Sequence, residues 1–485
     1  MAASFFFYDL ETSGFDARKA RIVQFAGQRT DMNLKPVGEP LNVLIKLTAD
    51  TVPEPDAVLV TGITPQQTLA EGVTEAEFLQ LFYEQAVTPD TIFVGFNSIR
   101  FDDEFMRFLN YRNFYEPYEW QWQDGRSRWD ILDVVRMTRA LRPEGIEWPF
   151  APDGKPANRL EFLTKVNKLS HDNAHDALND VYATIAVAKL LRDKQPDLFK
   201  YLLDMRNKKK VAELVGNGAP FVYTTGRYPS SNLHTSVAVL LAHHTQQDAL
   251  LVYDLRHDPT PFLKMSLDEL EQAWKYTRDP AAVRLPVKTI KYNRAPAVAP
   301  LGVIKDEATQ KRIGLTLTTV QKHLAILKPQ QIEFAEKLRQ IVKRLDDQRA
   351  KQQISMVDNA VTVDSRLYEN FINPGDKQTM RVVRAAKPAE LGPDLVEQLH
   401  DERLRSLLPL YKARNYPTSL TDEERADWDE FCRQQLFEGG ADSRLAKFFA
   451  RLEELSSGKP TAAQQYLLEE LQLYGQSLVP AEASS

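Results

Sequence analysis

The sequence predicts an α/β domain at the N-terminus, then a small mixed domain with a barrel-like β part, then a helical domain. Three observations support this order: strand-like and helical patterns alternate up to about residue 200, short strand-like runs follow, and helical periodicity dominates after about residue 355. At 485 residues the chain is too long for one hydrophobic core. We therefore expect domains at residues 1–205, 206–350 and 351–485.

The first domain is expected to form a strand meander followed by helical crossovers. Strand-like segments cover 4–9, 21–30, 41–47 and 91–96, and helical periodicity covers 75–87, 102–111, 128–141, 159–168 and 174–204. Three strands precede the first long helix, so they are expected to pair directly. Pro196 lacks a backbone N–H and is expected to divide the last helical segment.

The second and third domains differ in their patterns. Short strands are expected at 221–225, 236–242, 249–255 and 287–292, interrupted by helices at 266–277 and 306–327. Helices are then expected at 364–371, 394–412, 421–437, 441–456 and 460–476. Residues 346–362 are polar and weakly periodic, so they are expected to form the linker between these two domains.

Composition excludes several classes of protein. No run approaches the roughly 18 apolar residues of a membrane span, and no basic segment precedes the first strand, so neither a membrane span nor a secretory signal is expected. The single cysteine, Cys432, cannot form an intramolecular disulfide, which favours a reducing cytoplasm. The net charge of −6 argues against nonspecific polyanion binding. Cations nevertheless cluster at 206–210, 284–294 and 337–351.

Two carboxylates at the end of the first strand predict a metal site. The apolar run 5–8 leads into Asp9 and Glu11, and a small polar turn follows at 12–14. Side chains alternate along a strand, so the two acids lie on the same face. Because like charges at a buried strand end repel each other, a divalent cation between them is expected.

Two further segments supply more acids. Asp102 and Asp103 follow a strand and a Gly/Asn/Ser loop and open an amphipathic helix; the residues alone do not choose between them. Asp176 and Asp180 share one face of a later helix and are equally ambiguous. His175 precedes them, and its ordinary pKa of about 6.5 suits a general base near neutral pH.

The three motifs together resemble one group of enzymes. Asp-x-Glu-Thr-x-Gly, Asn-x-x-x-Phe-Asp and His-x-x-x-x-Asp occur in this order within the first 180 residues. The pattern is similar to the DEDDh group of 3′→5′ exonucleases, which have an RNase H-like fold. The resemblance favours Asp102 over Asp103 and Asp180 over Asp176. It implies four metal ligands and a general base, which are Asp9, Glu11, Asp102, Asp180 and His175. Four carboxylates can hold two Mg²⁺ ions, with Mn²⁺ as a substitute.

Other segments resemble one family within that group, bacterial exonuclease I. They are residues 57–66, 99–104, 111–115, 140–146 and 411–417, so the likeness reaches the third domain. The family implies an exonuclease domain, an SH3-like domain and a helical C-terminal domain around a groove for single-stranded DNA. It also implies processive, magnesium-dependent release of nucleoside 5′-monophosphates in DNA repair and recombination, by a cytoplasmic enzyme that we expect to be a monomer.

The resemblance also suggests substrate and partner residues. Residues at the first motif contact the terminal nucleotide in the family, and the aromatic and arginine-rich segment 111–129 suits stacking of unpaired bases beside phosphates. The expected substrate contacts are Glu11, Thr12, Ser13, Arg112, Tyr115 and Arg128. The family docks on the acidic C-terminal tail of the single-stranded-DNA-binding protein, which needs cations around an apolar pocket. The expected partner contacts are Arg142 and Tyr201, with Lys305, Arg312 and Lys328 as weaker candidates.

Two alternatives remain at this point. An RNA-directed DEDDh exonuclease shares the catalytic motifs, but small RNA-trimming members lack the roughly 280 residues that follow the first domain here. A single-strand-binding scaffold with a vestigial nuclease site is the other. A missing metal ligand would favour that reading, and none of the four is missing.

Overall fold

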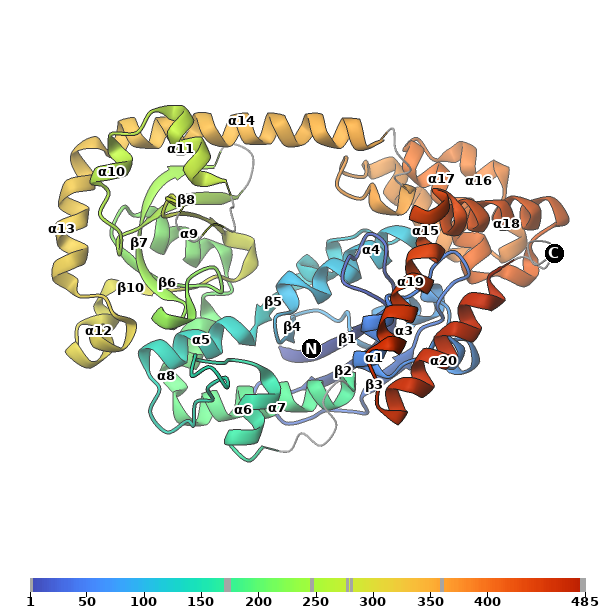
Figure 1. Ribbon diagram of the computed structural model, residues 1–485, viewed down its shortest axis with the longest axis horizontal. Helices are drawn as coiled ribbons and strands as arrows, with labels where there is room; N and C mark the ends of the chain where they lie inside the picture. The colour runs from blue at the N-terminus through green and yellow to red at the C-terminus, as the bar shows by residue number, and fades with distance from the viewer. Residues whose placement is uncertain are drawn as a thin grey trace.

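The computed structural model describes residues 3–169, 176–244, 248–275, 279, 282–357 and 362–479, with side chains omitted for 349–357. Three units follow one another along the chain (Figure 1). The long helix α14 (Gln331–Val357) runs from the second unit to the third. Within these ranges, the structure has no helix long and apolar enough to cross a membrane.

The first sheet has the expected meander and crossovers. Its strands are β1 (Ser4–Thr12), β2 (Ile22–Thr30), β3 (Leu41–Leu44), β4 (Thr91–Gly95) and β5 (Ser127–Asp130). Their spatial order is β3-β2-β1-β4-β5. The first three strands pair antiparallel, whereas β4 and β5 continue the sheet in parallel.

The helices of the first domain are α1 (Pro55–Thr61), α2 (Pro65–Glu71), α3 (Glu75–Gln85), α4 (Asp102–Arg112), α5 (Ile131–Leu141), α6 (Leu160–Val166), α7 (Ala177–Lys194) and α8 (Pro196–Asp204). The break at Pro196 is confirmed. The prediction of a helix from residue 128 is wrong for its first three residues. They pair with β4, and Asp130 caps α5 by accepting a hydrogen bond from the Leu132 N–H.

The second domain contains an antiparallel sheet of order β10-β6-β7-β8-β9. Its strands are β6 (Phe221–Thr224), β7 (Thr235–His243), β8 (Ala249–Asp254), β9 (Val287–Lys291) and β10 (Ala297–Pro300). Its helices are α9 (Lys208–Gly216), α10 (Thr260–Leu263), α11 (Leu267–Trp274), α12 (Glu307–Ile313) and α13 (Leu317–Leu327). The predicted helix 306–327 is divided at Gly314, whose φ of 62° ends α12.

The third domain is helical, as expected. Its helices are α15 (Pro374–Ala385), α16 (Pro393–Gln398), α17 (Glu402–Asn415), α18 (Asp422–Phe437), α19 (Arg444–Ser457) and α20 (Ala462–Ser477). Two predictions are wrong here. Residues 346–357 belong to α14 rather than to a linker, and 364–371 contain only the short 3-10 turn Val363–Ser365. A polar helix has a weak hydrophobic period, so composition alone did not separate it from a linker.

Strand β1 separates two hydrophobic cores. Phe5 and Phe7 pack into a core that continues into the second domain. Phe6 and Tyr8 point the other way, into a core that continues into the third domain. The first domain therefore shares one core with each of its neighbours, and its central strand reaches the site between them.

Candidate functional site

Three carboxylates converge at the end of β1. Asp9 and Glu11 come from β1 and Asp180 from the first turn of α7, and their oxygen atoms lie within 4.8 Å of one another. Asp102 is buried at the first residue of α4. These four residues are the ones that the resemblance implied; three of them meet within 4.8 Å, and Asp102 is close enough to act electrostatically on Asp9 and Glu11.

The acids raise one another's proton affinity. Burial, followed by Asp102, Asp180 and Glu11, raises the pKa of Asp9 well above its usual range. Burial and the carboxylates of Asp180, Asp102 and Asp176 raise the pKa of Glu11 to about 8. Burial also raises the pKa of Asp102 to about 8, with Asp103 and Asp130 adding to it and backbone hydrogen bonds opposing it.

This donor set fits hard divalent cations. It offers only carboxylate oxygens, which Mg²⁺ and Mn²⁺ prefer. The mutual repulsion that raises the pKa values would be relieved by positive charge at the same position. Asp9, Glu11 and Asp180, with Asp102 beside them, are therefore the residues that could hold such ions.

The structure separates Asp102 from its neighbour Asp103. Asp103 is 1% exposed and is surrounded by donors: Tyr8 Oη donates to its Oδ1 at 2.5 Å, and Arg128 forms a very close ion pair with its Oδ2. Asp102 has no such partner among the described side chains, and it acts electrostatically on both Asp9 and Glu11. The first acid faces the carboxylate cluster, and the second is bound into the protein.

Asp176 and Asp180 separate in the same way. Asp176 caps α7 by accepting a hydrogen bond from the Asn179 N–H at 3.1 Å, whereas Asp180 lies in the carboxylate cluster. His175, the predicted general base, lies outside the described residues, which resume at Asp176.

The turn after Glu11 is built by its own hydroxyl groups. Thr12 Oγ1 donates to the Gly14 carbonyl at 2.9 Å, and Ser13 Oγ accepts from the Arg21 N–H at 2.9 Å. Both side chains are buried. Their hydroxyls hold the turn, and the predicted contacts of Thr12 and Ser13 with a nucleotide stay predictions.

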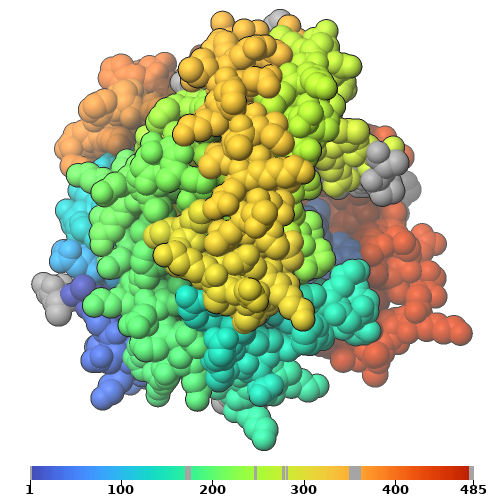
Figure 2. All heavy atoms as spheres, turned by 90° about the vertical axis from the view of Figure 1, so that its left-hand side faces the viewer, coloured from blue at the N-terminus to red at the C-terminus, as the bar shows by residue number. Residues whose placement is uncertain are grey.

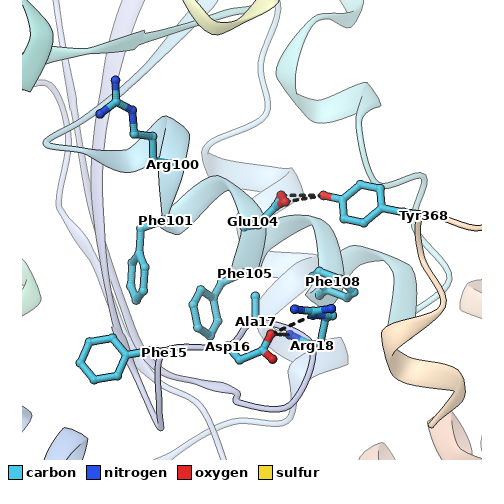
Figure 3. A pocket seen from close by; sticks show the side chains of 10 residues that line it. All are labelled: Phe15, Asp16, Ala17, Arg18, Arg100, Phe101, Glu104, Phe105, Phe108 and Tyr368. Carbon is cyan, nitrogen blue, oxygen red and sulfur yellow. Dashed lines mark hydrogen bonds and ion pairs between the residues drawn. The ribbon is translucent and has the colours of Figure 1, made fainter. Parts of the chain in front are cut away.

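A pocket of about 250 Å³ lies beside this turn (Figure 3). Phe15, on the turn, is 72% exposed, and the rings of Phe101 and Phe105 from the start of α4 lie near it. Tyr368, near the start of the third domain, donates to Glu104 at 2.6–2.7 Å. Sequence reasoning missed Phe15 because a lone aromatic in a turn has no periodic signal.

Three predicted substrate residues are engaged within the protein. Arg112 is 2% exposed and pairs with buried Glu75 at 2.8 Å, so its prediction as a substrate contact is wrong. The ring of Tyr115 stacks on Tyr83 at 4.4 Å and holds the Arg384 guanidinium 4.1 Å from its centroid, so it is not free to stack on a base. Arg128 binds Asp103 and is nearly buried.

Cations from two domains meet close to Arg128. Arg128 Nη2 donates to the Asn293 carbonyl at 2.8 Å, just after β9. Burial, then Arg107 and Arg128, lower the pKa of Arg294. Burial, then Arg294 and Arg227, lower the pKa of Lys291. The end of the cationic segment 284–294, from Lys291 to Arg294, therefore faces the first domain, where it can meet an anionic strand.

The predicted partner residues are only partly brought together. Arg142 Nη1 lies 3.4 Å from the Val303 carbonyl, and Arg312 Nη1 donates to the Ala140 carbonyl at 3.0 Å, so both join the first and second domains. Lys305 is exposed next to them, and Tyr201 is half-buried. Lys328 lies at the opposite end of α13, the yellow ridge of Figure 2, and is not part of this group.

Family comparisons cover nearly the whole chain. The model of the family described as "Exonuclease" matches residues 6–188, "Exonuclease I SH3-like domain" matches 206–344, and "Exonuclease I C-terminal domain" matches 361–478. Exodeoxyribonuclease I of Haemophilus influenzae is 39% identical over 98% of this chain and 99% of its own. The Escherichia coli enzyme is 39% identical over 91% and 92%.

Solved structures agree with these matches. E. coli exonuclease I in complex with a dA16 oligonucleotide has a TM-score of 0.90 and 36% identity, covering 98% of this chain and 100% of that one. A structure described as SSB/exonuclease I with an inhibitor has a TM-score of 0.88 and 36% identity, over 99% and 100%. A zinc-bound E. coli complex with single-stranded DNA has a TM-score of 0.90 and 35% identity, over 99% and 100%.

Proposed function

The chain belongs to the exonuclease I family, and we propose that it degrades single-stranded DNA processively from the 3′ end with two divalent metal ions. It is an exodeoxyribonuclease, a hydrolase with an RNase H-like exonuclease domain, an SH3-like domain and a helical C-terminal domain. Mg²⁺ is the proposed ion and Mn²⁺ its substitute. We propose that the activity serves DNA repair and recombination. We also propose that the enzyme is cytoplasmic and acts as a monomer.

The carboxylate cluster is the observation that carries the metal assignment. Asp9, Glu11 and Asp180 converge within 4.8 Å, and Asp102 raises the pKa of the first two. Divalent ions held there would supply positive charge at the phosphate and at the leaving 3′-oxygen. Asp9, Glu11, Asp102 and Asp180 would hold these ions and, as anions themselves, would not contact the phosphate directly. His175 accepts the proton of that water.

The pocket beside the turn suits a base of the substrate strand. Phe15 and Phe101 offer aromatic surface within a few residues of Glu11 and Asp102, and stacking on aromatic rings is independent of base identity. Phe15→Ala should therefore weaken binding of single strands, with a loss of about 1–3 kcal/mol per stacked base.

The decisive experiment is hydrolysis of a 3′-labelled oligonucleotide by the full chain and by Asp180→Asn, at several Mg²⁺ concentrations. The parent protein should release nucleoside 5′-monophosphates only with the metal. The variant should lose activity while keeping its fold, because it removes one negative charge from a repulsive cluster. Full activity of Asp180→Asn at ordinary Mg²⁺ would refute the ligand assignment.

The same assay separates DNA from RNA as substrate. Matched DNA and RNA strands, both labelled at the 3′ end, should be degraded at different rates, with DNA strongly preferred. The dA16 complex concerns the E. coli enzyme, and its likeness over the whole chain supports DNA here. Equal rates on the two strands would favour the RNA-directed alternative.

The proposed protein partner is the acidic tail of a single-stranded-DNA-binding protein. Arg142, Arg312 and Lys305 place positive charge where the first and second domains meet, and Tyr201 is a further candidate at that surface. An SSB/exonuclease I structure exists for a relative. A labelled acidic tail peptide should bind with salt-sensitive affinity. Arg142→Ala should weaken it without changing hydrolysis of bare DNA; equal binding removes Arg142 from the surface.

A further inference from the structure

Asp103 has more partners than a capping acid at a helix start needs. Its Oδ1 accepts from Tyr8, and its Oδ2 pairs closely with Arg128 and lies 3.8 Å from Arg107 Nη2. The side chain is 1% exposed. Tyr8 is buried, and its hydroxyl is the donor of this hydrogen bond. Asp103 is therefore fixed from both sides.

The residues that make these contacts are sequence neighbours of the proposed metal ligands. Tyr8 directly precedes Asp9 on β1, and Asp103 directly follows Asp102 on α4. The Tyr8–Asp103 hydrogen bond thus ties the strand that carries two ligands to the helix that carries a third. Because side chains alternate along β1, Tyr8 can hold α4 from one face while Asp9 and Glu11 lie on the other.

Arg128 extends this link to the second domain. Its Nη1 binds Asp103, and its Nη2 donates to the backbone carbonyl of Asn293, just after β9. The neighbouring Ser127 accepts a hydrogen bond from Arg206 at 3.0 Å, where the second domain begins. A planar guanidinium can serve both partners at once, which a lysine ammonium at the same position cannot do with the same geometry.

We propose that Asp103 is a positioning residue that sets the geometry of Asp102 at the metal centre, and that Arg128 makes this geometry depend on the seating of the SH3-like domain. The proposal rests on the metal site of the proposed function. It reassigns Arg128 from a substrate contact to a residue that acts through Asp103. Groups that orient metal ligands typically contribute 10–100-fold to metal affinity or activity.

The test measures metal binding directly, apart from catalysis. Mn²⁺ is titrated into the full-length protein, and the free ion is followed by electron paramagnetic resonance. Asp103→Asn should raise the Kd for Mn²⁺ by about 10–100-fold. Tyr8→Phe should raise it by a smaller factor. The Mg²⁺ concentration for half-maximal hydrolysis should rise in parallel, while KM for DNA at saturating metal changes little.

A matched control separates this effect from general destabilisation. Asp376 is a fully buried aspartate of the third domain that accepts backbone hydrogen bonds from His400 and Asp401 at 2.7 and 2.9 Å. Asp376→Asn should lower the melting temperature and leave the Kd for Mn²⁺ unchanged. If Asp103→Asn behaves in the same way, Asp103 is merely structural and the proposal is overturned.

Two variants at Arg128 test the domain link. Of the two variants, Arg128→Gln should raise the Kd for Mn²⁺ more. The Kd of Arg128→Lys should lie between that of Arg128→Gln and that of the parent protein, because lysine keeps the charge beside Asp103 but cannot bind Asp103 and Asn293 at once. Parent-like Mn²⁺ binding by Arg128→Gln would overturn this part. If the parent protein binds no more Mn²⁺ than Asp9→Ala does, the proposed metal site itself fails, and that result is distinct from either outcome above.

Discussion

At the scale of single residues, the site is a set of acids that resist simultaneous ionisation. Glu11 and Asp102 have pKa values of about 8, raised first by burial and then by their acidic neighbours. Without metal, the folded chain therefore binds protons that the unfolded chain has released. Stability from these groups is fully present below their ordinary pKa values and is lost as pH rises toward 8.

This sign gives a pH prediction. In EDTA, the melting temperature should fall as pH rises from about 5 to about 8.5, because the unfolded state binds fewer protons there. Mg²⁺ should raise the melting temperature, most strongly at the alkaline end, since cations replace the protons. Glu11→Gln should flatten the pH dependence in EDTA. Thermal melts across this pH range, with and without metal, test the prediction. A melting temperature that rises with pH in EDTA would contradict the raised pKa values of Glu11 and Asp102.

His175 carries the second residue-scale prediction. His175→Ala should slow cleavage by about 10²–10⁴-fold, the usual contribution of a positioned general base. Mn²⁺ binding should persist, since His175 is not assigned as a ligand. The acidic limb of the pH–rate profile should disappear if deprotonation of His175 limits the rate. A near-normal rate with an unchanged profile would remove His175 from the mechanism.

The residues differ in how far sequence could predict them. Ligand chemistry singled out Asp9 and Glu11 and left two pairs of acids open, and the resemblance to DEDDh exonucleases then chose Asp102 and Asp180. It could not foresee that Arg112 is paired with Glu75 or that Arg128 is bound to Asp103. Those partners are distant in the chain, and an arginine among aromatics has the same local pattern whether it meets DNA or a buried acid.

At the scale of elements, β1 organises the molecule because its two faces enter different cores. The apolar run at its start predicted a strand, and its position at the centre of the sheet explains why nearly every residue is buried. Strand β5 was missed because it has only four residues and ends at the cap of α5. A segment that short shows no period that would distinguish a strand from the start of a helix. The second half of helix α14 was mistaken for a linker. That helix is long, but it is polar, so its hydrophobic period is weak.

The pairing of β1 with β2 gives an element-scale prediction. Gly27 lies opposite Tyr8, and a Cβ there would come within 2.4 Å of the Phe6 ring. Gly27→Ala should therefore destabilise the protein by about 1–3 kcal/mol through overpacking. Gly216→Ala, at a helical glycine with open space around it, is the control and should be neutral or stabilising by up to about 1 kcal/mol. Urea unfolding measures both; equal stabilities would contradict the tight packing of β1 on β2.

At the scale of the whole molecule, a buried ionic junction joins the first and third domains. Arg414 of α17 binds Asp364 and Asp50, both at 2.7 Å, and Arg21 reaches the same two acids at 3.2 and 3.3 Å. Burial opposes ionisation of Asp364, but Arg414 and Arg21 hold its pKa well below the usual range. Arg21 also holds Ser13 in the turn beside Glu11. The seating of the third domain is thus connected to the edge of the active site.

Breaking this junction should separate processivity from chemistry. Asp364→Asn leaves two buried guanidinium groups short of negative charge, which costs about 3–5 kcal/mol when a buried pair loses one partner. We expect the third domain to seat less firmly, so that the number of nucleotides removed per encounter falls severalfold on long strands. Cleavage of a short oligonucleotide at saturating concentration should change much less, since Asp9, Glu11, Asp102 and Asp180 keep their own supports.

Glu430→Gln, which removes an exposed pair with Arg433 on α18, is the matched control and should alter neither property. Run lengths measured with a trap for free enzyme, together with urea unfolding, test this. A destabilised Asp364→Asn variant that keeps the parent run length would show that firm seating of the third domain is not what retains the strand.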